Sequence, residues 1–177
     1  MVNFKNYPRT CLLMLIVTLP ATACFAQQAE HQHDQKKHDK HQSEVNKRGD
    51  KAMGFSHKKT THRFRLLADG GAIEVRTNSA NDKESLEQIR KHLREITKAF
   101  PAGEFDAPFL THGKVPPGVP VMKRLGKEIN YEFEEIEGGG RVRLSTKNSE
   151  ALQAIHDFMR FQIEDHHTGD PTEIEKP

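Results

Sequence analysis

Histidine is the residue type in this chain whose number and spacing are best suited to chemistry. The sequence holds 11 histidines, and four of them share one short polar stretch, at His31, His33, His38 and His41. Imidazole is a ligand for zinc, copper and nickel, and His-x-His spacing lets one segment hold an ion through two or more nitrogens. The stretch therefore predicts metal binding, although a solubilising linker that takes up metal only adventitiously would look the same.

Three further histidines, far apart in the chain, are candidate ligands of a defined site. His62 follows Met53, whose thioether is a soft donor for Cu(I). His112 lies in a proline-rich connection. His166 lies among carboxylates that could converge with it on one ion, those of Asp165 and Asp170. Each of the three also has a plain interpretation as a surface or packing residue.

The sequence lacks the common signatures of catalysis. It has no Gly-x-Ser-x-Gly, no His-Glu-x-x-His and no glycine-rich phosphate loop. The two cysteines, Cys11 and Cys24, precede the part expected to fold, so disulfides and thiolate metal sites are excluded from that part. We expect no evident catalytic machinery, with a small transferase or hydrolase as a remote alternative.

Residues 1–26 have the order of a secretory signal peptide. Basic residues precede an apolar run of nine residues, Cys11 to Leu19, and small residues follow it. The run is far shorter than the roughly 20 residues of a spanning helix. Cleavage before Gln27 would release a periplasmic or secreted protein. In the alternative, the segment ending at Cys24 resembles a lipoprotein box, and lipidation there would anchor the protein to a membrane.

The charge balance argues against a nucleic-acid partner. Residues 1–26 hold two of the 27 Lys and Arg and none of the 25 Asp and Glu, so the remainder carries 25 of each sign. A neutral chain without a basic stripe lacks the electrostatic term that dominates nucleic-acid binding.

Composition and periodicity divide the rest of the chain into a tether, one domain and a tail. Residues 27–57 are polar and nearly free of large apolar side chains, which predicts a disordered, histidine-rich tether. Residues 58–170 suffice for one ordinary domain, and residues 171–177 form a tail.

The expected domain consists of two similar ββα units, over about residues 61–100 and 128–167. In each unit two alternating segments flank a glycine turn, and an amphipathic helical stripe follows. The stripes contain Leu86, Ile89, Leu93 and Ile96 in the first unit and Leu152, Ile155, Met159 and Ile163 in the second. Asn81 and Asn148 are the expected helix caps. The economical arrangement is an α+β fold, a four-stranded antiparallel sheet with both helices on one face.

The other face of this sheet offers a second class of function. It would carry the charged residues Arg63, Arg65, Glu74, Arg76, Glu132, Glu134, Arg141 and Arg143. Cross-strand ion pairs on a solvated surface explain such a face. Alternatively, this face or the proline-rich connection 102–127 docks a protein partner or a second copy of the chain, as in a non-catalytic interaction module.

Several segments carry a resemblance to known sequences. These are Lys59-Thr-Thr-His62-Arg-Phe64, Pro116-Pro-Gly-Val-Pro-Val-Met122-Lys-Arg-Leu125 and Phe158-Met-Arg-Phe-Gln-Ile163-Glu-Asp-His166. Over about 53–171 the chain resembles a family of small uncharacterised bacterial exported proteins, some of which are labelled aspartate carbamoyltransferase. The resemblance implies no catalytic residues. The carbamoyl phosphate-binding segments of those transferases, Ser-x-Arg-Thr-Arg and His-Pro-x-x-Gln, are absent, so we expect no such activity.

Together these features predict an exported metal-handling protein. Copper or zinc is the expected ion. The tether histidines would capture it, and His62, His112 and His166 would contribute to a site on the domain.

Overall fold

The computed structural model describes residues 22–176, with the side chains from Lys37 onward except that of His38. A compact unit, His38–Pro177, contains all the strands, and the chain before it forms a separate unit. Most of the expected signal peptide, residues 1–21, lies outside the described residues. Within residues 22–176, no helix combines the length and apolarity needed to cross a membrane.

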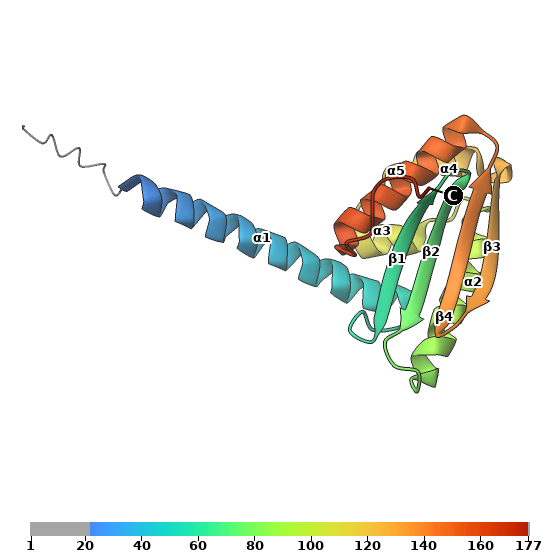
Figure 1. Ribbon diagram of the computed structural model, residues 1–177, viewed down its shortest axis with the longest axis horizontal. Helices are drawn as coiled ribbons and strands as arrows, with labels where there is room; N and C mark the ends of the chain where they lie inside the picture. Colours follow the sequence, from blue (N-terminus) through green and yellow to red (C-terminus); the bar gives the residue numbers. More distant parts are fainter. Residues whose placement is uncertain (1–21, 177) are drawn as a thin grey trace, which may run out of the picture. The chain divides into compact units, whose positions relative to one another are not determined.

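Four antiparallel strands form one sheet in the order β1-β2-β4-β3 (Figure 1). The first hairpin consists of β1 (Thr60–Leu67) and β2 (Gly70–Thr77), and the second consists of β3 (Ile129–Ile136) and β4 (Gly139–Thr146). The two hairpins meet where β2 pairs with β4. The expected α+β class and the two hairpins are confirmed.

Two long helices cover one face of the sheet, each following its hairpin. They are α2 (Lys83–Ala99) and α5 (Ser149–His166) (Figure 1). Asn148 caps α5 as expected, because its side chain accepts hydrogen bonds from the amides of Glu150 and Ala151. The cap of α2 is Asp82 and not Asn81, since the Asp82 carboxylate accepts from the amide of Ser85.

The connection between the two halves folds into short helices. These are α3 (Asp106–His112), α4 (Val119–Arg124) and a 3₁₀ turn at Gly126–Glu128. Proline near the start of α4 suits the first turn of a helix. Gly118 precedes it with a φ of 80°, and a Cβ there would lie 2.0 Å from the carbonyl oxygen of Ala154. This close approach to α5 therefore requires glycine.

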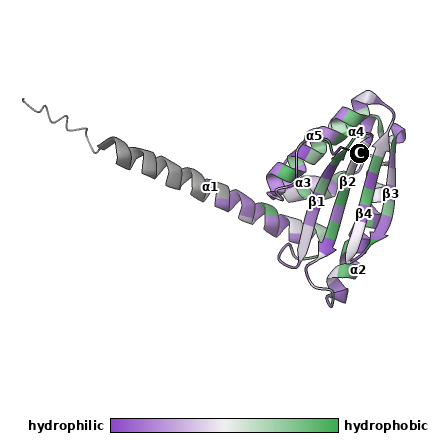
Figure 2. Cartoon of the chain, viewed as in Figure 1, coloured by the Kyte–Doolittle hydropathy of each residue, from purple (hydrophilic) through white to green (hydrophobic). Residues whose placement is uncertain are grey.

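The core lies between the helices and the sheet. Side chains along β1 point alternately toward the helices and toward solvent, and Phe64 and Leu66 are buried against the helices. Val142 and Leu144 on β4 are buried in the same way. Figure 2 shows the same alternation of hydrophobic and hydrophilic residues along the strands. His62 belongs to the inward series of β1, two residues before Phe64. It therefore faces the helices.

In place of the disordered tether expected over 27–57, the structure has the helix α1 (Thr22–Met53). Its second half belongs to the compact unit, where Val45 is fully buried and Gly49 is buried too. A Cβ on Gly49 would come within 3.4 Å of the Thr111 side chain, and Arg48 donates to the Thr111 carbonyl oxygen at 3.0 Å. Although α1 is polar overall, one apolar residue and one glycine pack it against the compact unit. The mean composition of the segment does not reveal these two contacts.

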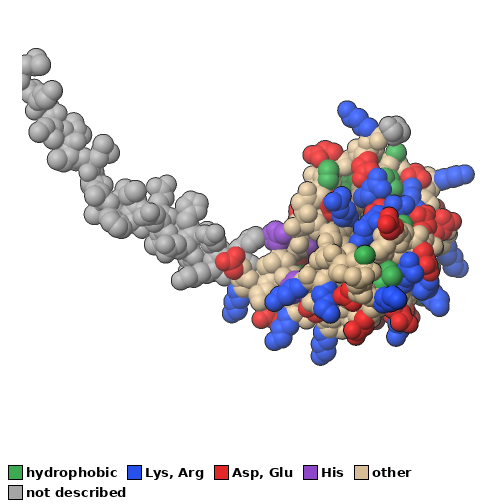
Figure 3. Space-filling view, turned by 60° about the horizontal axis from the view of Figure 1, so that its bottom comes forward, with side chains coloured by type: hydrophobic (Ala, Val, Ile, Leu, Met, Phe, Trp, Pro, Cys, Tyr) green, Lys and Arg blue, Asp and Glu red, His purple; other side chains and the backbone are tan. Residues whose placement is uncertain are grey.

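The outer face of the sheet is charged, as expected, and its charges pair with one another. Glu74 is buried there and accepts hydrogen bonds from Arg141 at 2.8 Å and from Arg65 at 3.4 Å. Burial acts to raise the pKa of Glu74, but the bonds and charges of these arginines outweigh it, so its pKa lies below the usual range. Figure 3 shows basic and acidic side chains interspersed over the face in view, which is typical of a solvated surface.

Of the expected tail, residues 171–177, the described part contacts the edge strand β1 through Glu175. The amide of Glu175 donates to the carbonyl oxygen of Leu66 at 2.9 Å, and Arg65 donates to the Glu175 carboxylate at 2.7 Å. These contacts cover part of the edge of the sheet.

Candidate functional site

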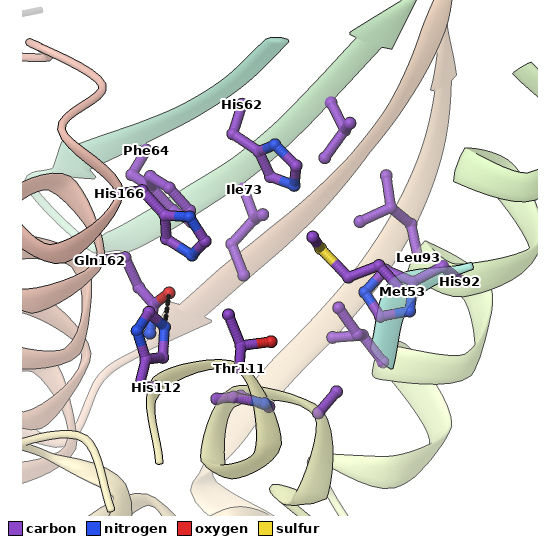
Figure 4. Close-up of a pocket in the computed structure, with 14 residues that line it drawn as sticks. Met53, His62, Phe64, Ile73, His92, Leu93, Thr111, His112, Gln162 and His166 are labelled. Carbon is purple, nitrogen blue, oxygen red and sulfur yellow. Dashed lines mark hydrogen bonds between the residues drawn. The ribbon is translucent and has the colours of Figure 1, made fainter. Parts of the chain in front are cut away.

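Five elements contribute histidines or a methionine to one small cavity beside the core. Its volume is about 50 Å³. The residues that could act as donors are Met53 from α1, His62 from β1, His92 from α2, His112 from α3 and His166 from α5 (Figure 4). Three of them, His62, His112 and His166, are the domain candidates that the sequence predicts. The structure brings all three to one place.

Local periodicity explains why these side chains face inward. His62 shares the inward face of β1 with Phe64, as described above. His92 lies three residues after Ile89 and four before Ile96, within the buried stripe of α2. His166 follows Gln162 by four residues, so both lie on one face of the last turns of α5.

Ring contacts connect the imidazoles. The rings of His62 and His166 stack with centroids 5.6 Å apart and planes 8° apart. The ring of His112 meets that of His166 edge-on, at 4.9 Å. Phe55 contacts both His62 and His92, each with a centroid distance of 5.8 Å. The histidines thus form a row of aromatic contacts along the cavity.

The protein interior keeps three of these imidazoles neutral. Burial lowers the pKa of His92 to about 4. Burial, assisted by the proximity of His92, lowers the pKa of His62 to about 4. Burial, assisted by His62 and His112, lowers the pKa of His166 to about 3. A neutral imidazole has a lone pair on one ring nitrogen, which is the form that binds metal.

The ring nitrogens of these three histidines have no hydrogen-bond partners among the described residues. His156, a buried histidine outside the cavity, is different. Its Nε2 lies 2.9 Å from the carbonyl oxygen of Leu67 and 3.1 Å from that of Gly70, so it links α5 to the first hairpin. The ring nitrogens of His62, His92 and His166 are not among the fully buried side-chain atoms that lack a partner in the described part of the chain, so water or an ion in the cavity can reach them.

His112 is held more firmly. Its Nδ1 lies 2.6 Å from Oδ2 of Asp165, and its Nε2 lies 2.9 Å from the Gln162 side-chain oxygen. Asp165 also lies 3.1 Å from Nε2 of His41 on α1 and 3.6 Å from the Lys114 ammonium. This set of bonds fixes the orientation of the His112 ring. Of the four cavity histidines, His112 is consequently the least available as a ligand.

A wider depression lies on the outer side of His62 and His166. It has a volume of about 370 Å³, and both histidines line it as well as the inner cavity. His57 also lines it, and its Nδ1 lies 2.9 Å from the Asp50 carboxylate. A carboxylate on one imidazole nitrogen orients the other nitrogen, as in many metal sites. The stacked pair thus separates a histidine-lined depression from the inner cavity.

Among the described residues, the others predicted as metal ligands do not line this cavity. The predictions at His31, His33 and His38 fall on side chains outside the described set. His41 is described, and it pairs with Asp165. The expected convergence of Asp165, His166 and Asp170 on one ion does not occur. Asp165 binds His112, while the Asp170 carboxylate accepts from the amide of Phe64 at 2.9 Å.

Sequence reasoning missed His92. Its position between Ile89 and Ile96, at steps of three and four residues, was a usable signal because it placed an ionisable side chain within a buried stripe.

The cavity is suited in size and lining to an ion or to a few waters. One water needs roughly 10–15 Å³ on this measure, whereas pockets for organic ligands are typically about 300–1,000 Å³. Of the 14 described residues that line the cavity, none is acidic. As the side chains stand, no group of three or more His, Cys, Asp or Glu within the described residues could hold a metal ion. Ion binding would therefore require the rings to turn.

Comparison with known proteins finds no matching family, no similar curated protein and no similar solved structure. The function must therefore be argued from the site itself.

Proposed function

We propose that this chain is an exported metal-handling protein that binds a copper or zinc ion in the histidine cavity of its domain. One observation carries the proposal. His62, His92 and His166 line one cavity beside Met53, and their ring nitrogens have no hydrogen-bond partner among the described residues. Because no described protein group uses these nitrogens, an ion that enters the cavity can bind them without breaking a hydrogen bond of the fold. If water and not an ion occupies the cavity, the metal titration will show no binding there.

The rings can reach a shared ion by rotation about their side-chain bonds. Stacked parallel rings direct their nitrogens side by side, so His62 or His166 must turn for both to bind one ion. A neighbouring depression of about 370 Å³ gives these two rings space on their outer side. Half-buried side chains beside open space change rotamer readily. The ion-free arrangement is thus compatible with a site that closes around its ion.

A route for the ion supports the same function. His57 lines the outer depression, and the stacked pair of His62 and His166 lies between this depression and the cavity. The histidines of α1 precede this region in the sequence. In this proposal they capture the ion at the surface, and the domain then retains it.

Metal titration of a chain that keeps only the domain donors tests the proposal. The cavity-only chain is the full chain with four histidines changed to Gln and two cysteines changed to Ser, namely His31, His33, His38, His41, Cys11 and Cys24. Calorimetry with Zn(II), Cu(II) and, without oxygen, Cu(I) should show one ion bound per chain. If the cavity-only chain binds none of the three ions, the proposal fails.

A matched pair of variants locates the site. His166→Asn removes a cavity donor, whereas His167→Asn changes the next residue, which lines the outer depression alone. We use Asn at both positions so that the two variants match. Asn also tolerates the left-handed conformation of residue 167, where the φ of His167 is 51°. We expect His166→Asn to weaken metal binding by at least about tenfold and His167→Asn to leave it nearly unchanged. Equal effects would contradict the assignment.

A second candidate function is docking of a protein partner at the proline-rich connection. Phe109, Leu110 and Val115 are large hydrophobic residues that stand exposed there. Such side chains often mark interaction sites. Phe109→Ser together with Leu110→Ser should abolish a partner complex while leaving metal binding intact. The charged sheet face receives less support, because Arg65 and Arg141 already pair with Glu74.

A further inference from the structure

We infer that the cavity selects Cu(I), held by the Met53 thioether and the imidazoles of His62, His92 and His166, in preference to Zn(II) or Cu(II). This inference rests on the proposed function, because it names the ion of the same cavity. It concerns the oxidation state and charge of the ion, which the proposal above leaves open.

The donor set favours a soft ion. Met53 comes from the end of α1, and Figure 4 shows its sulfur directed into the cavity that His62 and His92 line. Thioether ligands select Cu(I), whereas structural zinc sites use four nitrogen, thiolate or carboxylate donors. Within the described residues, no three His, Cys, Asp or Glu side chains converge on one ion as they stand. The Met53 thioether therefore adds a donor to two of the imidazoles, and the third imidazole joins the ion only when its ring turns.

His62 occupies the centre of the set. Its ring contacts that of His166 at 5.6 Å, and the proximity of His92 contributes to its lowered pKa. Met53 and the three histidines come from four different elements. The ion would thus link α1, β1, α2 and α5.

The charge of the cavity favours a monovalent ion. All four donors are neutral, and no acidic side chain is among the described residues that line the cavity. Two carboxylates outside the lining act on these histidines, Asp50 on His62 and Asp165 on His166. They are already bonded to His57 and His112. The Born cost of transferring an ion from water rises with the square of its charge, so a divalent ion pays about fourfold more than a monovalent one. Apolar neighbours such as Phe64 and Ile73 do not offset this cost.

Competition among four ions tests the selectivity on the cavity-only chain defined above. Cu(I) and Ag(I), the latter a monovalent soft ion without redox chemistry, are added against a chromophoric chelator without oxygen. Zn(II) and Cu(II) are added separately. We expect one Cu(I) or Ag(I) per chain, with Zn(II) at least about a hundredfold weaker. Binding of Zn(II) as tight as that of Cu(I) would overturn the inference and leave the proposed function standing. Failure of all four ions to bind would overturn both.

A methionine pair tests the donor. Met53→Leu removes the cavity thioether, and Met122→Leu makes the same change at a fully buried methionine outside the cavity. Met-to-Leu changes conserve volume and are well tolerated. We expect Met53→Leu to weaken Cu(I) binding by at least about tenfold and Met122→Leu to leave it nearly unchanged. Equal affinities in the two variants would overturn the role of Met53.

X-ray absorption provides a second readout that does not depend on a variant. Because the cavity-only chain has no cysteine, a sulfur neighbour of bound copper must belong to a methionine. A spectrum with a sulfur neighbour supports the inference, and one with nitrogen neighbours alone overturns it.

Discussion

The imidazoles of His62 and His166 stack with their centroids 5.6 Å apart and their planes 8° apart, although one belongs to the first strand and the other to the end of the last helix. Neither ring has a hydrogen-bond partner among the described residues. Two positively charged rings at this distance would repel, so the contact disfavours the state with both rings charged, and burial keeps both neutral by lowering their pKa values. The fold thus holds two neutral, unpaired nitrogen donors together at the boundary between the cavity and the outer depression.

If His62 serves a ligand, its removal should not harm the ion-free fold. We predict that His62→Phe keeps the ring contact with His166 and changes the free energy of unfolding by less than about 1 kcal/mol, because the substitution removes no hydrogen bond to the described part of the protein. Metal affinity of the cavity-only chain should fall by at least about tenfold. Chemical denaturation and calorimetry measure the two quantities. A large loss of stability would show that His62 has a structural role.

His156→Phe provides the contrast. His156 is buried, and unlike the ring nitrogens of His62 its Nε2 is bonded to protein, to the carbonyl oxygens of Leu67 and Gly70. The substitution leaves these acceptors unpaired, so we expect unfolding to become easier by about 1–3 kcal/mol. Metal affinity should remain unchanged. A stability equal to that of the unmodified chain would contradict this role.

The ion-free protein should lose stability in mild acid. The cavity histidines His62 and His92 have folded-state pKa values of about 4, and that of His166 is about 3, against 6.5 in the unfolded chain. Between these values the unfolded state binds protons that the folded state excludes. The stability that these groups contribute is therefore complete above pH 6.5 and falls as the pH drops toward 4, by up to about 1.4 kcal/mol per pH unit for each histidine.

Urea unfolding at several pH values, without metal, measures this slope. The His62→Phe variant should show a shallower slope than the unmodified chain. An identical slope in both would contradict the pKa assignment of His62.

Asp165→Asn should destabilise the end of α5 and its contact with α3. Asp165 accepts from His112 at 2.6 Å and lies 3.1 Å from Nε2 of His41. Because hydrogen bonds to a charged group contribute about 1.5–3 kcal/mol, we expect a loss within this range. Asp157→Asn, at a more exposed acidic residue of the same helix, should cost less than about 0.5 kcal/mol. Thermal unfolding that gives equal losses would contradict the role of Asp165.

Val45→Ala should loosen the second half of α1. Val45 is fully buried although the helix around it is polar. We expect the change to cost about 1–2.5 kcal/mol and to speed amide hydrogen exchange over residues 41–53. Glu44→Ala, at the exposed neighbouring residue, is the control and should leave exchange nearly unchanged. Slow exchange in the Val45 variant would show that the helix does not depend on this contact.

Much of the fold could be predicted because its signals are local. Alternation in the strands, glycine at the turns and the stripes of α2 and α5 all repeat within short windows, and these elements are confirmed. The helix over 38–53 was different. It depends on Val45 docking against the domain and on the close approach of Gly49 to Thr111, and both are tertiary contacts. Average composition alone favoured disorder there.

The candidate site could likewise be predicted only in part, because some of its signals are local and the rest depend on tertiary contacts. His62, His112 and His166 could be singled out by residue type, but their meeting depends on the packing of three elements that no sequence window contains. His92 had a local signal, its place in the α2 stripe. The engagement of Asp170 with the amide of Phe64 had none, because it depends on the C-terminal segment folding back on β1.

The most direct test of the central claim is the position of the ion in a crystal of the cavity-only chain grown with Cu(I) in the absence of oxygen. Anomalous scattering at the copper edge locates the metal without reference to any assumed ligand. We predict one strong peak within the cavity, bounded by Met53, His62 and His166. A peak confined to other surfaces, or an empty cavity at saturating Cu(I), would contradict it.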